Sequence, residues 1–296
     1  MKKIYLFAGI SILCWSTVAT ITKLLLGDLN SIQLLWASSL FASIFLLALN
    51  IFSGNIKTLK KYKPKDYLIT MLIGFPGTFL YYIFYYAGAD LLPASQAFII
   101  NYMWPIMSVV FACIILKEKI TIRKSIAIIV SFLGVGIVTS GEIINLNQNT
   151  LWGSLFCILG AVSYGLFTSL NQKMHYEKRI SMMFNYFVTF FLTTIINLIN
   201  GNIFLPDFGQ ILGFAWNGMF TMAVANTFWI LALENGNTAK ISNLAYITPF
   251  LSLIWTFLIL KEEININLII GLLVIVSGIL IQLKGHAKNQ QKSLSK

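Results

Sequence analysis

Polar and aromatic side chains set inside long apolar runs are the residues of this chain best suited to chemistry. Two short segments carry them, Asn101-Tyr102-Met103-Trp104-Pro105 and Tyr246-Ile247-Thr248-Pro249. A proline inside a helix has no N–H to donate and leaves the carbonyl four residues earlier unpaired, here Asn101 and Ala245. In a bilayer such a carbonyl must face protein or a wet cavity. A cavity-lining bend is therefore expected at both prolines, with a simple packing kink as the alternative.

Aromatic residues are so numerous, with 7 Trp, 12 Tyr and 23 Phe, that most must face lipid, fill the interior or lie at the interfaces. Those at mid-depth of their runs are the better candidates for binding a solute. Asparagine and threonine at similar positions could orient amino or carboxylate groups, although asparagine also bonds neighbouring helices. The candidate substrate-binding set is Trp15, Tyr82, Asn101, Tyr102, Trp104, Tyr164, Asn226, Tyr246 and Thr248.

Glycine and proline near the middle of apolar runs mark candidate bends or gates, because they weaken or interrupt a helix. The candidates are Gly74, Pro76, Gly77, Pro105, Gly218 and Pro249. Tyr82 belongs to a group of four tyrosines at 81–86 that covers two faces of its run, so only some of them can point inward.

Charged and catalytic groups are missing from the centres of the runs. All 10 acidic residues lie at run ends or in connections, which argues against a proton relay or a cation-binding carboxylate pair. Lys23 is expected to snorkel to an interface. Metal hydrolysis needs ligands at depth, and nucleophilic catalysis needs a base beside Ser16 or Cys14; neither arrangement is visible. We expect no catalytic residue, no metal site and no cofactor, with an intramembrane enzyme as the remote alternative.

Ten apolar runs must position these residues. The 296-residue chain is 57% hydrophobic and 10% charged, whereas soluble domains are about 25% charged. A membrane helix needs about 20 apolar residues. Runs of that kind lie at 4–26, 31–52, 66–89, 94–116, 122–141, 150–172, 180–200, 209–233, 239–260 and 267–283. The composition thus predicts an all-α integral membrane protein with ten transmembrane helices.

Basic residues fix the expected orientation. Apart from Lys23 and Lys261, the 21 basic residues fall on one side if the spans alternate, and the positive-inside rule makes that side the cytoplasm. Both termini are then cytoplasmic in the plasma or inner membrane. The net charge of +11 reflects topology, so no nucleic-acid partner is expected.

An internal repeat appears at an offset of 144 residues. Tyr102 and Pro105 fall on Tyr246 and Pro249, and Leu116-Lys117-Glu118 falls on Leu260-Lys261-Glu262. A unit of five helices is odd, so the second unit must enter the membrane in the opposite sense. Such 5+5 inverted repeats occur in secondary transporters, which place their site at the repeat interface.

This layout resembles the drug/metabolite transporter superfamily, with EamA-type five-helix repeats expected at 1–141 and 142–284. Trp15, Ala94-Ser95-Gln96 and the repeated proline-then-Lys-Glu pattern carry the resemblance. Residues 101–105 are similar to the Asn-Tyr-Leu-Trp-Pro segment of aromatic amino acid exporters, and 246–249 to their aromatic-x-Thr-Pro segment. The basic tail at 285–296 is expected to be disordered.

The sequence therefore favours a secondary transporter that alternates access around a neutral aromatic cavity. The expected partners are a small organic solute and the lipid bilayer, and the chain is expected to act as a monomer or homodimer. The resemblance implies export of neutral or aromatic amino acids. Export of lipophilic drugs or quaternary cations is the alternative.

Overall fold

The chain is helical throughout the part seen in the computed structural model, which describes residues 2–143, 148–174, 176–202, 204–235, 241 and 243–294. The elements are α1 (Lys2–Ser16), α2 (Val18–Leu26), α3 (Ser31–Phe52), η1 (Asn55–Lys61), α4 (Pro64–Phe75), η2 (Pro76–Leu80), α5 (Tyr81–Leu91), α6 (Ala94–Asn101), α7 (Trp104–Ile115), α8 (Ile122–Ile143), α9 (Gln148–Gln172), α10 (Lys178–Ile199), α11 (Phe208–Ala215), η3 (Trp216–Val224), α12 (Ala225–Asn235), η4 (Ala245–Ile247), α14 (Thr248–Trp255), η5 (Thr256–Leu260) and α15 (Ile266–Leu294). Within these ranges the expected all-helical class is confirmed.

Seven helices of the described part are long and apolar enough to cross a membrane. They are Lys3–Leu26, Ser31–Phe52, Pro64–Leu91, Ala94–Ile115, Ile122–Ser140, Gln148–Gln172 and Lys178–Ile199, followed by the shorter apolar helices Ala245–Leu260 and Ile266–Ile281. The predicted run at 209–233 is helical as α11, η3 and α12. The predicted run at 239–260 starts at 239–240, outside the described residues. A count of ten spans remains a prediction.

Side chains in the first turn of two helices accept hydrogen bonds from the backbone N–H of the residue just before each helix. At α4 the Asp66 carboxylate accepts the Lys63 N–H at 2.8 Å, and at α11 the Gln210 side-chain oxygen accepts the Asp207 N–H at 3.1 Å. Each bond satisfies a backbone donor near the start of a helix. These two bonds are 144 positions apart in sequence, so equivalent helices of the predicted repeat start in the same way.

Several spans are broken, as the positions of Pro76 and Pro105 predict. The 64–91 span passes into the π-helical segment η2 at Pro76, and the 208–235 span contains the π-helical segment η3. Residues Tyr102 and Met103 separate α6 from α7, just before Pro105. Wider π turns change which face a helix presents and often occur at functional sites.

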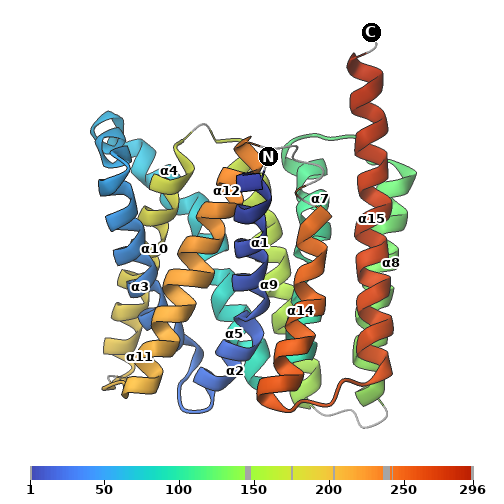
Figure 1. Ribbon diagram of the computed structural model, residues 1–296, viewed down its shortest axis with the longest axis horizontal. Helices are drawn as coiled ribbons and strands as arrows, with labels where there is room; N and C mark the ends of the chain where they lie inside the picture. The colour runs from blue at the N-terminus through green and yellow to red at the C-terminus, as the bar shows by residue number, and fades with distance from the viewer. Residues whose placement is uncertain are drawn as a thin grey trace.

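The helices run side by side as one bundle (Figure 1), with both marked chain ends towards the same end of the view. Packed pairs include α8 with α15, α3 with α10, α5 with α9 and α1 with α12. In Figure 1 the α8–α15 pair forms one lateral edge, α3, α10 and α11 form the other, and α5 and α9 lie between them. The centre is thus built mainly from the helices that carry the predicted site residues.

The last helix extends past the bundle. Helix α15 runs to Leu294 and projects beyond the other helices in Figure 1, and disorder of the tail at 285–296 stays a prediction. A helix satisfies its own backbone hydrogen bonds and Lys and Gln have good helix propensity, so a polar sequence can extend a span in this way.

Candidate functional site

A tyrosine cluster occupies the centre of the bundle. Helix α5 contributes Tyr82, Tyr85 and Tyr86, which are all buried. The Tyr82 hydroxyl lies 3.3 Å from that of Tyr186 on α10, and the rings of Tyr82 and Tyr86 are 5.6 Å apart. This cluster joins two of the bundle's helices through polar edges and aromatic faces.

The aromatic contacts continue from the cluster towards the Pro105 bend. The Tyr81 ring lies 4.8 Å from that of Tyr82 in the cluster and 4.8 Å from that of Tyr164 on α9. The Trp104 ring stands edge-on to Tyr164 at 5.1 Å, and that of Tyr102 follows at 6.4 Å. The structure therefore brings the predicted residues Tyr82, Tyr102, Trp104 and Tyr164 into one chain of aromatic contacts. Trp104 and Tyr164 are only partly buried, so their rings retain surface that a solute could cover.

The carbonyl that Pro249 cannot bond has a partner from the other half of the chain. The Tyr102 hydroxyl donates to the carbonyl of Ala245 at 2.5 Å. Thr248, beside that proline, is 2% exposed, and its hydroxyl interacts with that of Tyr102. The bend at Pro249 thus contacts Tyr102 through both a backbone carbonyl and a side chain.

Two predicted site residues use their amides for the fold. Asn101 donates from Nδ2 to the carbonyl of Cys157 at 3.2 Å, which ties α6 to α9. Asn226 donates to the carbonyl of Met222 at 2.7 Å, one turn earlier on its own helix. Both hydrogen bonds match the alternative that these asparagines stabilise the fold. A role of either asparagine in holding the solute stays a prediction.

The remaining predicted binding residues lie outside this chain of aromatic contacts. Trp15 is partly buried and packs edge-on against Trp229 of α12, with ring centroids 5.3 Å apart. Tyr246 is partly buried against the core. Trp15 therefore belongs to the α1–α12 contact, and its part in a site rests on the sequence prediction alone.

The predicted bend glycines sit where helices approach closely. A Cβ at Gly74 would overlap the Asn185 side chain, and one at Gly77 would overlap the Phe167 ring. A Cβ at Gly218 would overlap the backbone carbonyl of Ser38. Each glycine is needed for helix contact, whereas a gating role for them or for Pro76 stays a prediction.

A polar network behind the tyrosines was missed by the sequence reasoning. Asn217 is fully buried and donates to the Tyr86 hydroxyl at 2.8 Å and to the Ser38 hydroxyl at 3.0 Å. Its side-chain oxygen accepts the Thr221 hydroxyl at 2.9 Å. The sequence does carry an indication, because Asn217 directly precedes a predicted bend glycine.

A buried polar stripe on α10 was also missed. Ser181, Asn185, Thr189, Thr193 and Asn197 recur every fourth residue and are all buried. That spacing places them on one helix face. The Thr189 hydroxyl donates to that of Thr78 at 3.0 Å, so the stripe reaches the bent 64–91 span. Their period is readable in the sequence and predicts the packed face of this helix.

Lys23 bonds the C-terminal end of α5, and its snorkelling to an interface stays a prediction. Its ammonium donates to the carbonyls of Ala89 at 2.8 Å and Leu92 at 2.7 Å. The side chain finds these acceptors because the last turn of α5 leaves carbonyls without helical partners. Among the described residues, no group of three or more His, Cys, Asp or Glu is placed to hold a metal ion.

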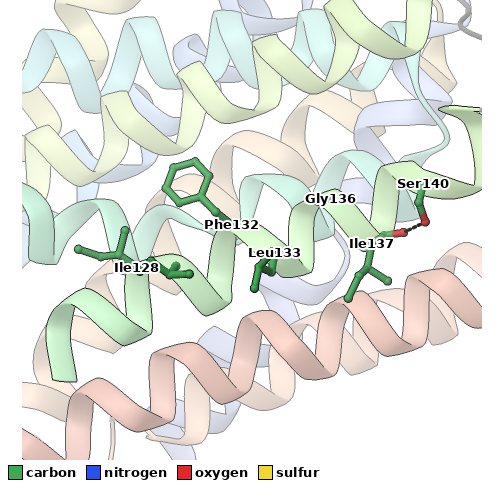
Figure 2. A pocket seen from close by; sticks show the side chains of 7 residues that line it. Ile128, Phe132, Leu133, Gly136, Ile137 and Ser140 are labelled. Carbon is green, nitrogen blue, oxygen red and sulfur yellow. Dashed lines mark hydrogen bonds between the residues drawn. The ribbon is translucent and has the colours of Figure 1, made fainter. Parts of the chain in front are cut away.

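A shallow groove on α8 faces away from this centre. It is lined by Ile128, Ile129, Phe132, Leu133, Gly136, Ile137 and Ser140, all from that one helix. Figure 2 shows these residues along α8 and labels all but Ile129, with the Ser140 hydroxyl donating back to the Ile137 carbonyl at 2.8 Å. Leu133 is 61% exposed, as suits a helix face in contact with acyl chains.

Comparison with known proteins identifies the family. The EamA-like transporter family matches residues 2–140 and 151–283. The chain belongs to the EamA-like transporter family. It is therefore a multi-pass membrane protein of a transporter family, and its relatives are named as transporters, not as enzymes.

Named relatives of this EamA-like protein are transporters. An uncharacterized transporter of Clostridium kluyveri is 25% identical over 300 residues, covering 97% of this chain and 95% of that protein. The uncharacterized transporter YoaV of Bacillus subtilis is 24% identical over 231 residues, covering 75% and 76%. The S-adenosylmethionine uptake transporter of Rickettsia prowazekii is 24% identical over 181 residues, covering 58% of each chain.

A solved crystal structure shares the fold of this chain. It superposes with a TM-score of 0.67 and covers 95% of this chain and 96% of the solved one, at 17% identity. At that identity the likeness speaks for the fold alone.

Proposed function

We propose that this EamA-like protein is a secondary transporter of small organic solutes that alternates access through two inverted five-helix repeats, 1–141 and 142–284. The proposal rests first on contacts that recur at the 144-residue offset. Gly74 meets Asn185, and Gly218 meets Phe41. Gly218 lies 144 positions after Gly74, and Asn185 lies 144 positions after Phe41. Exchanging the two repeats therefore converts one contact into the other.

Further contacts support the same symmetry. The Ser131 hydroxyl donates to the carbonyl of Ile275, 144 positions away, at 3.4 Å. Helices α8 and α15 therefore cross at equivalent positions, as expected on a two-fold axis. Lys117 and Lys261 share left-handed backbone angles, with φ of 55° and 58°. Inverted repeats of this kind can exchange conformations and so expose a central site to each side in turn.

The chain of aromatic contacts from Tyr82 through Tyr164 to Trp104 carries the substrate proposal. Such rings offer flat apolar surfaces and hydroxyl edges, which suit a neutral or aromatic amino acid side chain. Backbone and hydroxyl groups near Pro105 and Pro249, including the Thr248 hydroxyl, would hold its charged end. Export is proposed from the resemblance to amino acid exporters, with both termini in the cytoplasm of a plasma or inner membrane.

Organic cations are the second candidate class. Aromatic rings attract cations through their faces, so the same cluster would accept quaternary ammonium compounds. The relative named for S-adenosylmethionine uptake favours this candidate, because that compound joins an amino acid group to a cationic sulfonium.

Uptake into proteoliposomes tests the proposal and separates the two classes. Labelled phenylalanine, tryptophan, S-adenosylmethionine, tetraphenylphosphonium and a sugar phosphate are offered to vesicles with the protein and to empty vesicles. The proposal predicts saturable flux of an aromatic amino acid and none of the sugar phosphate. Saturable flux of the cations alone would favour the second class, and no saturable flux of any solute would refute transport by this cluster.

A further inference from the structure

Two oppositely charged side chains hold the ends of the turn between α5 and α6. Lys23 of α2 donates to the carbonyls of Ala89 at 2.8 Å and Leu92 at 2.7 Å, at the C-terminal end of α5. Glu262, just after η5, accepts the N–H groups of Ala94 at 2.6 Å and Ser95 at 2.9 Å, at the start of α6. Three segments distant in sequence, namely α2, the α5–α6 turn and the segment after η5, therefore meet here.

Each charge has the sign that its helix end favours. The last carbonyls of a helix carry partial negative charge and the first N–H groups partial positive charge. A lysine at the first and a carboxylate at the second form charge-assisted hydrogen bonds, which are stronger than neutral ones. The turn is thereby fixed to α2 from one half of the chain and to the end of η5 from the other half.

The first half of the chain has the same local backbone structure at Glu118, but the Glu118 carboxylate has a different partner. Glu118 lies 144 positions before Glu262, and both follow a lysine with positive φ. The N–H of Glu118 donates to Ala112 at 3.3 Å, and that of Glu262 donates to Thr256, again 144 positions on, at 3.4 Å. The Glu118 carboxylate, however, binds Lys124 at 2.8 Å. The residue 144 positions after Lys124 is Leu268, so Glu262 lacks the equivalent lysine as an ion-pair partner.

Buried polar groups without partners lie directly behind the Glu262 contact. Ser95 is 1% exposed and Gln96 is 3% exposed, and the Ser95 hydroxyl and Gln96 amide nitrogen have no hydrogen-bond partner. Buried polar groups of this kind favour contact with water. Opening of the turn would hydrate them, which lowers the cost of releasing the Glu262 bonds.

We propose that Glu262 and Lys23 form a latch that keeps this end of the bundle closed, and that the transport cycle releases Ala94 and Ser95 from Glu262. The latch residues are positioning residues that act through the ends of α5 and α6, and they belong to neither the tyrosine cluster nor the bends. The inference rests on the proposed alternating access. Closure at this end, with the matching Glu118 held by Lys124, describes one of the two states of the cycle.

The test measures solvent access behind the latch. Ser95→Cys provides a reporter thiol in a chain in which Cys113 is replaced by alanine. The native Cys14 and Cys157 are buried and are retained. Cys157 packs against Gly88 of α5 close to the latch, so Cys14 on α1 is the reporter of general unfolding. A water-soluble maleimide is applied to the purified protein in detergent, and mass spectrometry follows each thiol separately. Gln96→Cys replaces the reporter if the first variant does not fold.

Glu262→Gln should raise the labelling rate at position 95 about tenfold, because a charged hydrogen bond is lost. Lys23→Gln should act in the same direction, and Glu262→Asp should restore slow labelling in part. The control is Glu263→Gln, which changes the exposed neighbouring carboxylate and should leave the rate unchanged.

Two outcomes would overturn the latch. Equal labelling in Glu262→Gln and Glu263→Gln would show that the carboxylate does not control access. A parallel rise at position 95 and at Cys14 would show general loosening instead of a local opening. Neither readout needs a transported solute, so a failure of the substrate proposal leaves the latch tested independently.

Discussion

The hydroxyl of Tyr102 donates a hydrogen bond to the carbonyl of Ala245 at 2.5 Å. Ala245 is the residue whose carbonyl Pro249 cannot bond within its own helix, because proline has no N–H. Tyr102 itself precedes the other bend, at Pro105. One side chain thus joins the two bent helices and satisfies the acceptor that the second bend exposes.

Removing this hydroxyl should destabilise the protein. Tyr102→Phe leaves the buried Ala245 carbonyl without its partner, which costs on the order of 1–3 kcal/mol. A thermal-shift assay in detergent should show a lower Tm than wild type. Tyr246→Phe is the control, since it leaves the bond to Ala245 in place. An unchanged Tm for Tyr102→Phe would mean that water replaces the hydroxyl at no cost.

The two equivalent glycines should differ in their tolerance of a methyl group. Gly218→Ala would drive a Cβ into the backbone carbonyl of Ser38, whereas Gly74→Ala would meet the side chain of Asn185. Backbone cannot move aside cheaply, so Gly218→Ala should lose about 1–3 kcal/mol or more, seen as poor yield of folded protein.

Relief by a second substitution checks the origin of the Gly74 effect. Combining Gly74→Ala with Asn185→Ala should recover folded yield relative to Gly74→Ala alone. Gly136→Ala is the matched control, because nothing lies near its added Cβ. Equal losses for all three glycine variants would contradict the close approaches described here.

The buried network at Asn217 should contribute more to stability than a locally bonded asparagine. Asn217→Ala leaves the buried hydroxyls of Tyr86 and Ser38 without their donor, at a cost of about 1–3 kcal/mol. Asn226→Ala removes a bond within one helix and should cost under about 1 kcal/mol. Thermal denaturation of both variants compares them directly, and a larger loss for Asn226→Ala would refute this assignment.

Transport should not depend on a proton gradient. All 10 acidic residues of the chain are predicted at the ends of spans or in connections, so no carboxylate is expected at mid-depth to carry a proton. Counterflow of an aromatic amino acid should be unchanged by a protonophore or by an imposed pH gradient. Accumulation of the amino acid driven by a pH gradient alone would contradict this prediction, because it would require a proton path through the protein.

The sequence predicted the parts of this structure that follow from local physics. Apolar runs marked the helices, and Pro76 and Pro105 marked two of the breaks. The 144-residue offset anticipated paired features such as the turns at Lys117 and Lys261. These are properties of a short stretch of chain, so its own residues determine them.

Partners from distant helices were less accessible to sequence reasoning. The sequence could not name the Cys157 carbonyl as the partner of the Asn101 amide, or the end of α5 as the partner of Lys23. Which helix lies opposite a polar side chain depends on packing of the whole bundle. The polar stripe of α10 is an exception, because its four-residue period could have been recognised.

Trp104 provides the most direct test of the central claim, that the chain of aromatic contacts binds the transported solute. Trp104→Ala removes a ring that packs edge-on against Tyr164 and retains exposed surface. Loss of an aromatic side chain from a binding surface costs about 1.5–3 kcal/mol, or roughly tenfold to hundredfold in affinity. The control, Trp152→Ala, removes a tryptophan that is 53% exposed on α9.

The measurement is counterflow of labelled phenylalanine into proteoliposomes that contain equal amounts of wild type, Trp104→Ala or Trp152→Ala. The account predicts saturable counterflow in the wild type and in Trp152→Ala, and at least a tenfold higher KM in Trp104→Ala at similar folded yield. Unchanged kinetics in Trp104→Ala, with counterflow intact, would remove this ring from the solute's path and contradict the aromatic site.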